Sequence, residues 1–168
     1  MALIVEDGTN VPGADSYISE ADAITRAQTL GLDFPTDPND AEVPLRRAAI
    51  YLEKYRNQYQ GKKVFDDQSL QWPRDPVYID DIYNPKENIP QELIDAQVAI
   101  ASADFSGQQL YGTSVGSVTS KSVGDVSVTK GNSGTLDNSA YLGFANELLK
   151  PILKNAKLGA LEFKVCRA

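Results

Sequence analysis

The stretch IPQELIDAQVAIASADFSG, at residues 89–107, predicts the fold more clearly than any other part of the chain. Pro90 suits the first position of a helix, and Gly107 suits the position just after its end. Between them, apolar residues occur on almost every side of the predicted helix, which is typical of a helix buried among neighbours. The alanines predict close approach of other helices. These apolar residues are Leu93, Ile94, Ala96, Val98, Ala99, Ile100, Ala101, Ala103 and Phe105.

A first helix is predicted near the N-terminus. Ser19 is a good N-cap, with Asp22 three residues later and Ile18 placed as a hydrophobic staple. We expect this helix to run to about Leu30 and to end at Gly31, where glycine allows a left-handed turn.

The clearest amphipathic helix is predicted between Pro44, which we place in its first turn, and Gly61. Its apolar face predicts core contacts, although tyrosines at the same spacing, together with Arg56, also fit a face for stacking bases. We favour the core. The apolar face consists of Leu45, Ala48, Ala49, Leu52, Tyr55 and Tyr59.

A fourth helix is predicted after Asn138 or Ser139, either of which is suited to cap it, and Pro151 should interrupt this helix near its end. The fold class is therefore mainly α, a small bundle of about four helices. We expect a helical domain over residues 1–155 and an extended C-terminal tail over residues 156–168.

The segment at residues 112–134 is rich in Val, Ser, Thr and Gly and predicts an inserted β-hairpin or ribbon. A two-stranded hairpin is marginal alone in water, so we expect it to pair with something beyond its own two strands. The alternative is a flexible surface loop. The residues concerned are Val115, Val118, Lys121, Val123, Val126 and Val128.

The tail at residues 156–168 alternates apolar with polar or small residues in its second half and is net basic on an acidic chain. This pattern is typical of a peptide that docks on another surface, and a frayed terminus is the alternative. The candidate docking residues are Leu158, Leu161, Phe163, Lys164, Val165 and Arg167.

Composition limits the possible chemistry. The 168 residues contain no histidine and one cysteine, which excludes histidine-dependent nucleophilic catalysis and an intramolecular disulfide. We therefore expect no enzyme, cofactor or metal. Asp66-Asp67 and Asp80-Asp81 resemble solvated turn residues more than metal ligands. The net charge of −7 disfavours binding to nucleic-acid backbones but is compatible with a local basic patch.

Residues 62–88 show no sustained period and contain the sequence Trp72-Pro73-Arg74. So long a connection is usually functional or wraps a partner. We expect Trp72 to anchor this loop on the core; the alternative is that Trp72 and Arg74 anchor an interface. No apolar run is long enough to span a membrane, and residues 1–6 lack the basic start of a signal peptide. We therefore expect a protein that is cytoplasmic or is assembled in a cytoplasm.

Several short motifs, in this order, resemble a family of small proteins from tailed bacteriophages. Its members are labelled DnaT-like single-stranded-DNA-binding, and they also resemble head–tail connector, or head-completion adaptor, proteins. The resemblance covers roughly residues 3–155. The motifs are VEDGT at residue 5, PGADSYIS at 12, LRRAAIYL at 45, QWPR at 71, IP at 89 and KSVGDVSV at 121.

The resemblance implies two functions. An adaptor, assembled in the host cytoplasm, would form a ring, typically of twelve subunits, under the portal protein in the virion neck. The ring would join the portal to a neck or tail protein, and genomic double-stranded DNA would pass through it without specific binding. The ribbon would contribute to an inter-subunit sheet or to the lumen, and the tail would dock on the portal. A DnaT-like protein would bind single strands during phage replication. From the acidic charge, the ribbon and the tail we expect the adaptor, with the single-strand-binding protein as the alternative.

Overall fold

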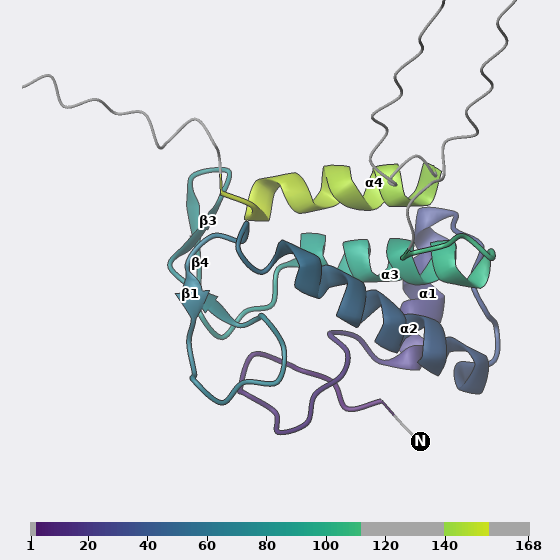
Figure 1. Cartoon of the computed structure of the whole chain (residues 1–168), viewed down its shortest axis with the longest axis horizontal. Coiled ribbons are helices and arrows are strands. Elements are labelled where there is room, and N and C mark those ends of the chain that lie inside the picture. The colour runs from purple at the N-terminus through teal and green to yellow at the C-terminus, as the bar shows by residue number, and fades with distance from the viewer. Residues whose placement is uncertain (1–2, 112–139, 155–168) are drawn as a thin grey trace, which may run out of the picture.

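A computed structural model describes residues 3–111 and 140–154 (Figure 1). Within these ranges the fold is mainly α, which confirms the predicted class. The four α-helices are α1 (Glu20–Leu30), α2 (Pro38–Leu52), α3 (Gln91–Phe105) and α4 (Ala140–Leu149). Two single-turn 3-10 helices, η1 (Glu53–Tyr55) and η2 (Lys150–Ile152), follow α2 and α4. The predicted ribbon at residues 112–134 and tail at 156–168 lie outside the described residues.

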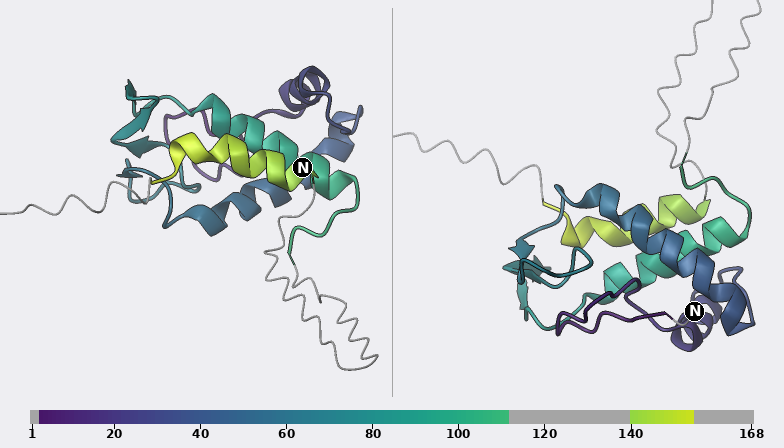
Figure 2. Two further views of the ribbon diagram at one scale, coloured as in Figure 1. Left: turned by 90° about the horizontal axis from the view of Figure 1, so that it is seen from above. Right: turned by 60° about the horizontal axis from the view of Figure 1, so that its bottom comes forward.

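Helix α3 is the centre of the bundle. It packs against α1, α2 and α4, and α4 runs back along it toward the strands (Figures 1 and 2). Buried residues occur on every side of α3, as its sequence predicts, because small alanine side chains let the neighbouring helices come close. Pro90 precedes the helix by one residue, and Gly107 follows it with a φ of 77°. This short stretch therefore organises the whole body.

The limits of α1 agree with the prediction. The backbone N–H of Asp22 donates to Ser19 Oγ at 3.2 Å, and Gly31 ends the helix with a φ of 68°. The predicted start of α2 is wrong, because the helix begins at Pro38 and contains Pro44 in its interior. The side chain of Asp37 caps this helix by accepting the N–H of Asn39. Pro38 then takes the first helical position, for which the fixed φ of proline is suited.

Two short antiparallel strand pairs lie at one end of the bundle, where α2 ends and α3 begins (Figure 1). Strand β1 (Lys62–Lys63) pairs with β2 (Arg74–Asp75), and β3 (Val77–Ile79) pairs with β4 (Ile82–Asn84). Strands of two or three residues are too short to show alternation, which explains why their segment has no period in the sequence. We call residues 56–84 the strand-bearing end.

The core prediction for α2 is confirmed. All six residues of its predicted apolar face are at most 7% exposed, so Tyr55 and Tyr59 are not available to stack bases. The ring of Tyr59 lies 6.3 Å from that of Tyr55 in η1 and meets Trp72 edge to face at 5.7 Å, so Tyr59 joins the helical body to the strand-bearing end. None of the helices in the described ranges combines the length and apolar character that crossing a membrane requires.

Buried polar side chains attach the N-terminal segment to the bundle. Gln97 of α3 accepts the N–H of Tyr17 at 3.0 Å and donates to Ser16 Oγ and to the carbonyl of Leu45 at 2.9 and 3.0 Å. The Tyr17 hydroxyl in turn accepts the backbone N–H groups of two residues of the strand-bearing end, Gln71 and Trp72. Interior hydrogen bonds thus connect four segments distant in sequence.

Candidate nucleic-acid interface

The position of Arg74 organises the strand-bearing end. Cis peptide bonds precede Pro73 and Pro76, one on each side of Arg74. Arg74 is buried, with 6% of the residue exposed. The guanidinium donates to the carbonyl oxygens of Gln60 at 2.8 Å and Gly61 at 2.9 Å. Weaker contacts reach the backbone carbonyl and the side-chain oxygen of Gln71 at 3.4 and 3.3 Å. This arginine therefore holds the entry to β1 against the loop that contains Trp72.

A basic hollow of about 400 Å³ opens beside Arg74. Arg56 and Lys62 are exposed on its rim, and Lys63 is half-buried. Burial lowers the pKa of Arg74 from its ordinary value, although nearby tyrosines and Glu53 act in the opposite direction. We call this feature the basic hollow, and its lining residues are Arg56, Asn57, Lys62, Lys63, Gln71 and Arg74.

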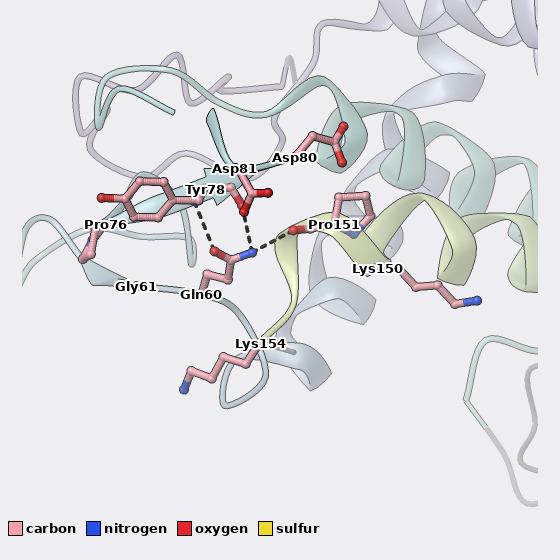
Figure 3. Close-up of a pocket in the computed structure, with 9 residues that line it drawn as sticks. All are labelled: Gln60, Gly61, Pro76, Tyr78, Asp80, Asp81, Lys150, Pro151 and Lys154. Atoms are coloured by element: carbon pink, nitrogen blue, oxygen red, sulfur yellow. Dashed lines mark hydrogen bonds between the residues drawn. The ribbon is translucent and has the colours of Figure 1, made fainter. Parts of the chain in front are cut away.

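A larger groove, of about 740 Å³, is lined by Gly61 and by residues of the β3–β4 hairpin and η2 (Figure 3). Gln60 braces it: its amide nitrogen donates to the carbonyls of Tyr78 at 3.0 Å and Pro151 at 2.7 Å, while its oxygen accepts the N–H of Tyr78 at 3.1 Å. The amide thus ties the β3–β4 hairpin to η2. The groove is lined by Gln60, Gly61, Pro76, Tyr78, Asp80, Asp81, Lys150, Pro151 and Lys154.

Lys154 lies between the groove and the basic hollow. It lines the groove, and its Nζ donates at 3.1 Å to the carbonyl of Asn57, which lines the hollow. The backbone N–H of Lys154 also bonds the carbonyl of Gln58 at 2.7 Å. Basic side chains therefore continue from the hollow to the groove, and we call Arg56, Lys62, Lys63 and Lys154 the basic strip.

The β3–β4 hairpin is apolar on its exposed surface. Ile82 is 73% exposed, Tyr78 51% and Tyr83 47%, and the two tyrosine rings lie 5.8 Å apart. The two-residue turn between the strands is made by Asp80 and Asp81, both with positive φ, a conformation that aspartate tolerates better than most residues. Exposed aromatic faces next to basic side chains are suited to stack bases beside a phosphate backbone.

The two acidic pairs singled out in the sequence have structural contacts in the described part of the chain. In residues 3–111 and 140–154, no group of three or more potential metal ligands gathers, and Asp80-Asp81 form the hairpin turn. Asp67 of the other acidic pair accepts a hydrogen bond from the side chain of Asn10 at 2.8 Å. The strand-bearing end therefore presents cations, amides and exposed tyrosines beside the carboxylates of Asp80 and Asp81 in the groove.

Among the candidate residues from the sequence, Trp72 and Arg74 fall in the described ranges. Trp72 is fully buried, which agrees with the expected core anchor, and an interface anchored by it would require the indole to leave the core. Arg74 is buried too, and it contributes to the hollow through its hydrogen-bonded guanidinium. The ribbon and tail candidates, from Val115 to Val128 and from Leu158 to Arg167, lie outside the described residues and stay predictions.

Sequence reasoning missed the basic strip. The signal that could have found it is local charge: Lys54, Arg56, Lys62 and Lys63 occur within ten residues of an acidic chain. The contribution of Lys154 has no such signal, because only the fold brings η2 beside the residues that follow η1.

Comparison with known proteins gives one finding. No significant match exists among curated proteins or among solved structures. A protein-family model matches residues 1–168, the whole chain. The protein therefore belongs to the family described as "Putative DnaT-like ssDNA binding protein".

Proposed function

We propose that this protein is a non-catalytic, phage-associated protein that binds single-stranded DNA at its strand-bearing end. The observation that carries the proposal is the basic strip beside exposed Tyr78, on a chain whose net charge is −7. The description of the family supports the same conclusion. An overall acidic charge does not oppose it, because screening confines electrostatic contacts to within about 8–10 Å of each charge.

In this proposal the phosphates of a single strand follow the basic strip, and one or two bases stack on the exposed tyrosines. Such contacts do not read sequence, since every base has a stackable face. Affinity should fall as salt rises, because each neutralised phosphate releases counterions.

Fluorescence anisotropy of a labelled oligonucleotide, titrated across a salt series, tests the proposal. We expect measurable binding at low salt, and the slope of log K against log salt should become shallower by about one to two in Lys62→Gln/Lys63→Gln. The matched control is Arg47→Gln/Lys86→Gln, which removes the same charge from residues that do not line the hollow or the groove. Absence of binding by the unmodified protein at low salt would refute the function.

We propose the head-to-tail adaptor as a second function, and the exposed hairpin is the observation that favours it. Tyr78, Ile82 and Tyr83 give the two-stranded ribbon an apolar surface, and β4 pairs with no strand other than β3 among the described residues. Both are features of a surface that pairs with another chain. In this proposal identical subunits form a closed ring, of twelve in the related connectors, between portal and tail proteins in the virion neck.

Light scattering of the protein alone and with portal rings of its own phage tests the adaptor. A stoichiometric complex would support it, and a monomer that ignores the portal would refute it. We expect Ile82→Ser to weaken the complex and Ile50→Ser, at a 61% exposed position on α2, to leave it unchanged. Deleting residues 155–168 should abolish portal binding while the protein stays folded; undiminished binding would refute the docking role of the tail.

A further inference from the structure

Arg74 has a buried charge and only neutral hydrogen-bond acceptors. Its acceptors are the backbone oxygens of Gln60, Gly61 and Gln71 and the side-chain amide oxygen of Gln71. None of the ion pairs among the described residues includes Arg74. A buried arginine normally has a carboxylate or another anion as its partner, because desolvating an unpaired charge is costly.

The strand register adds a second unpaired charge. Lys63 lies directly opposite Arg74 in the β1–β2 pair, and like charges in directly opposed positions destabilise a sheet. Lys63 Nζ has a carbonyl partner, that of Gln68 at 3.1 Å, so its charge is not compensated by a carboxylate either. An anion in the hollow would relieve both charges at once.

The carboxylates near the hollow make no hydrogen bond to Arg74. Glu53 Oε2 accepts from the side chain of Gln71 at 2.7 Å and from Arg56 at 3.3 Å, whereas Glu53 Oε1 is buried without a hydrogen-bond partner. Glu53 thus acts on Arg74 only through its charge, which raises the pKa of the guanidinium against the larger effect of burial. Asp75, the neighbour of Arg74 in β2, accepts the hydroxyl of Tyr83 at 2.6 Å. Neither carboxylate lines the hollow, so its walls carry four cations and two amides.

We propose that the basic hollow is a built phosphate-binding site, centred on Arg74, that holds one phosphate group of the DNA strand. The guanidinium is held in place by two backbone carbonyls, and Nη2 keeps one N–H without a protein acceptor, which can donate to the anion. Lys62 and Lys63 close on the phosphate from the rim, and the amides of Asn57 and Gln71 supply further donors. The DNA source of this phosphate rests on the function proposed above.

The direct test is an NMR titration of the full chain with inorganic phosphate at constant ionic strength, with chloride as the balancing anion. The observed signal is the Nε–H of Arg74, identified by its loss in Arg74→Lys. We expect a saturable shift of this signal, and affinity at least tenfold weaker in Lys62→Gln/Lys63→Gln, whose exposed or half-buried side chains are not needed for the core. Arg47→Gln/Lys86→Gln should stay within twofold of the unmodified protein.

The outcomes separate the site from the function. A shift that does not saturate, or that the double lysine variant leaves unchanged, overturns the site. If Lys62→Gln/Lys63→Gln does not change the affinity for DNA, the phosphate site is also refuted, but the proposed binding of single-stranded DNA is not. Saturable phosphate binding by a protein that ignores DNA supports the site and refutes the DNA function.

Discussion

In the helical body, α2, α3 and α4 meet through aliphatic and small side chains, whereas the strand-bearing end buries Gln68, Gln71 and Arg74 beside Trp72. The body is held by close packing of periodic faces. The other end is held by side chains that bond backbone carbonyls, such as Gln68 Nε2 to the carbonyls of Leu70 and Pro73, both at 3.1 Å. Tyr59, whose ring contacts both Tyr55 and Trp72, joins the two regions.

This difference matters for function. Packing of apolar faces makes a rigid body but leaves no unbalanced charge, whereas a loop held by neutral acceptors can keep a cation such as Arg74 buried and available to a ligand. The strand-bearing end is therefore the region that the fold makes suitable for binding, and the helices fix its position.

The largest effect should come from Trp72, which links the two regions. Trp72→Ala should lower the free energy of unfolding by about 3–5 kcal/mol, because a large, fully buried side chain would leave a cavity against Tyr59. Urea denaturation followed by circular dichroism measures this loss.

Trp72→Phe is the matched control. Its effect should be clearly smaller, since the indole N–H has no hydrogen-bond partner in the described part of the chain. If Trp72→Ala instead reduced assembly with a portal more than it reduced stability, the residue would be an interface anchor and the core assignment would fail.

Gly61 offers the next largest effect and a way to test how tightly the strand-bearing end is closed. A Cβ at Gly61 would lie 2.6 Å from the carbonyl oxygen of Pro76, whereas one at Gly31, with a similar positive φ, would meet nothing within 4 Å. Gly31→Ala should cost about 1–2 kcal/mol of backbone strain. Gly61→Ala should cost about 1–3 kcal/mol beyond that.

Thermal or urea unfolding of both glycine variants measures the difference. Because Gly61 also accepts a hydrogen bond from Arg74, Gly61→Ala should weaken phosphate binding while Gly31→Ala does not. A Cβ at Gly61 would also lie 2.8 Å from the carbonyl carbon of Asp75 in β2. Equal destabilisation of the two variants would therefore mean that β2 moves away easily to make room for this Cβ.

The helical body could be predicted because its signals are local. The Ser19 cap, Gly31, Gly107 and the buried character of α3 depend on residues within a few positions of one another, and all appear in the structure as expected. The sequence predicts the start of α2 six residues too late, because Pro38 and Pro44 are both suited to the first turn of a helix. The cap made by Asp37 is what identifies Pro38 as the start.

The strand-bearing end could not be predicted because its contacts are distant in sequence. Gln60 bonds Tyr78 and Pro151, and Lys154 bonds Asn57, across as many as 97 residues. Strands of two residues carry no pattern, and a basic hollow built from both members of a strand pair is visible only once their register is known.

Substitution of Gln97 tests whether buried hydrogen bonds also stabilise the helical body. Gln97→Met keeps the shape but leaves the N–H of Tyr17, the hydroxyl of Ser16 and the carbonyl of Leu45 without this partner, so we expect a loss of about 1–3 kcal/mol in unfolding free energy. The control is Gln91→Met in the same helix, where the exposed side chain makes one bond to Asp95. Similar losses in both variants would remove the special role of the buried amide.

The smallest effect concerns Tyr83, which connects the hairpin to β2. Its hydroxyl donates to Asp75 at 2.6 Å, and this hydrogen bond raises the pKa of Tyr83 above its ordinary value, with a smaller contribution from burial. The pKa of Tyr83 is therefore higher in the folded than in the unfolded protein. The hydrogen bond stabilises the fold fully at pH values below about 10, the pKa of an unfolded tyrosine, and this contribution is lost as the pH rises through the folded pKa.

Ultraviolet titration of the protein, compared with its Tyr83→Phe variant, isolates the ionisation of Tyr83. In Asp75→Asn the pKa of Tyr83 should move back toward its ordinary value. A Tyr83 that ionises like a free tyrosine in the unmodified protein would mean that the hairpin moves independently of β2, so that the exposed tyrosines and the basic hollow could not act as one surface.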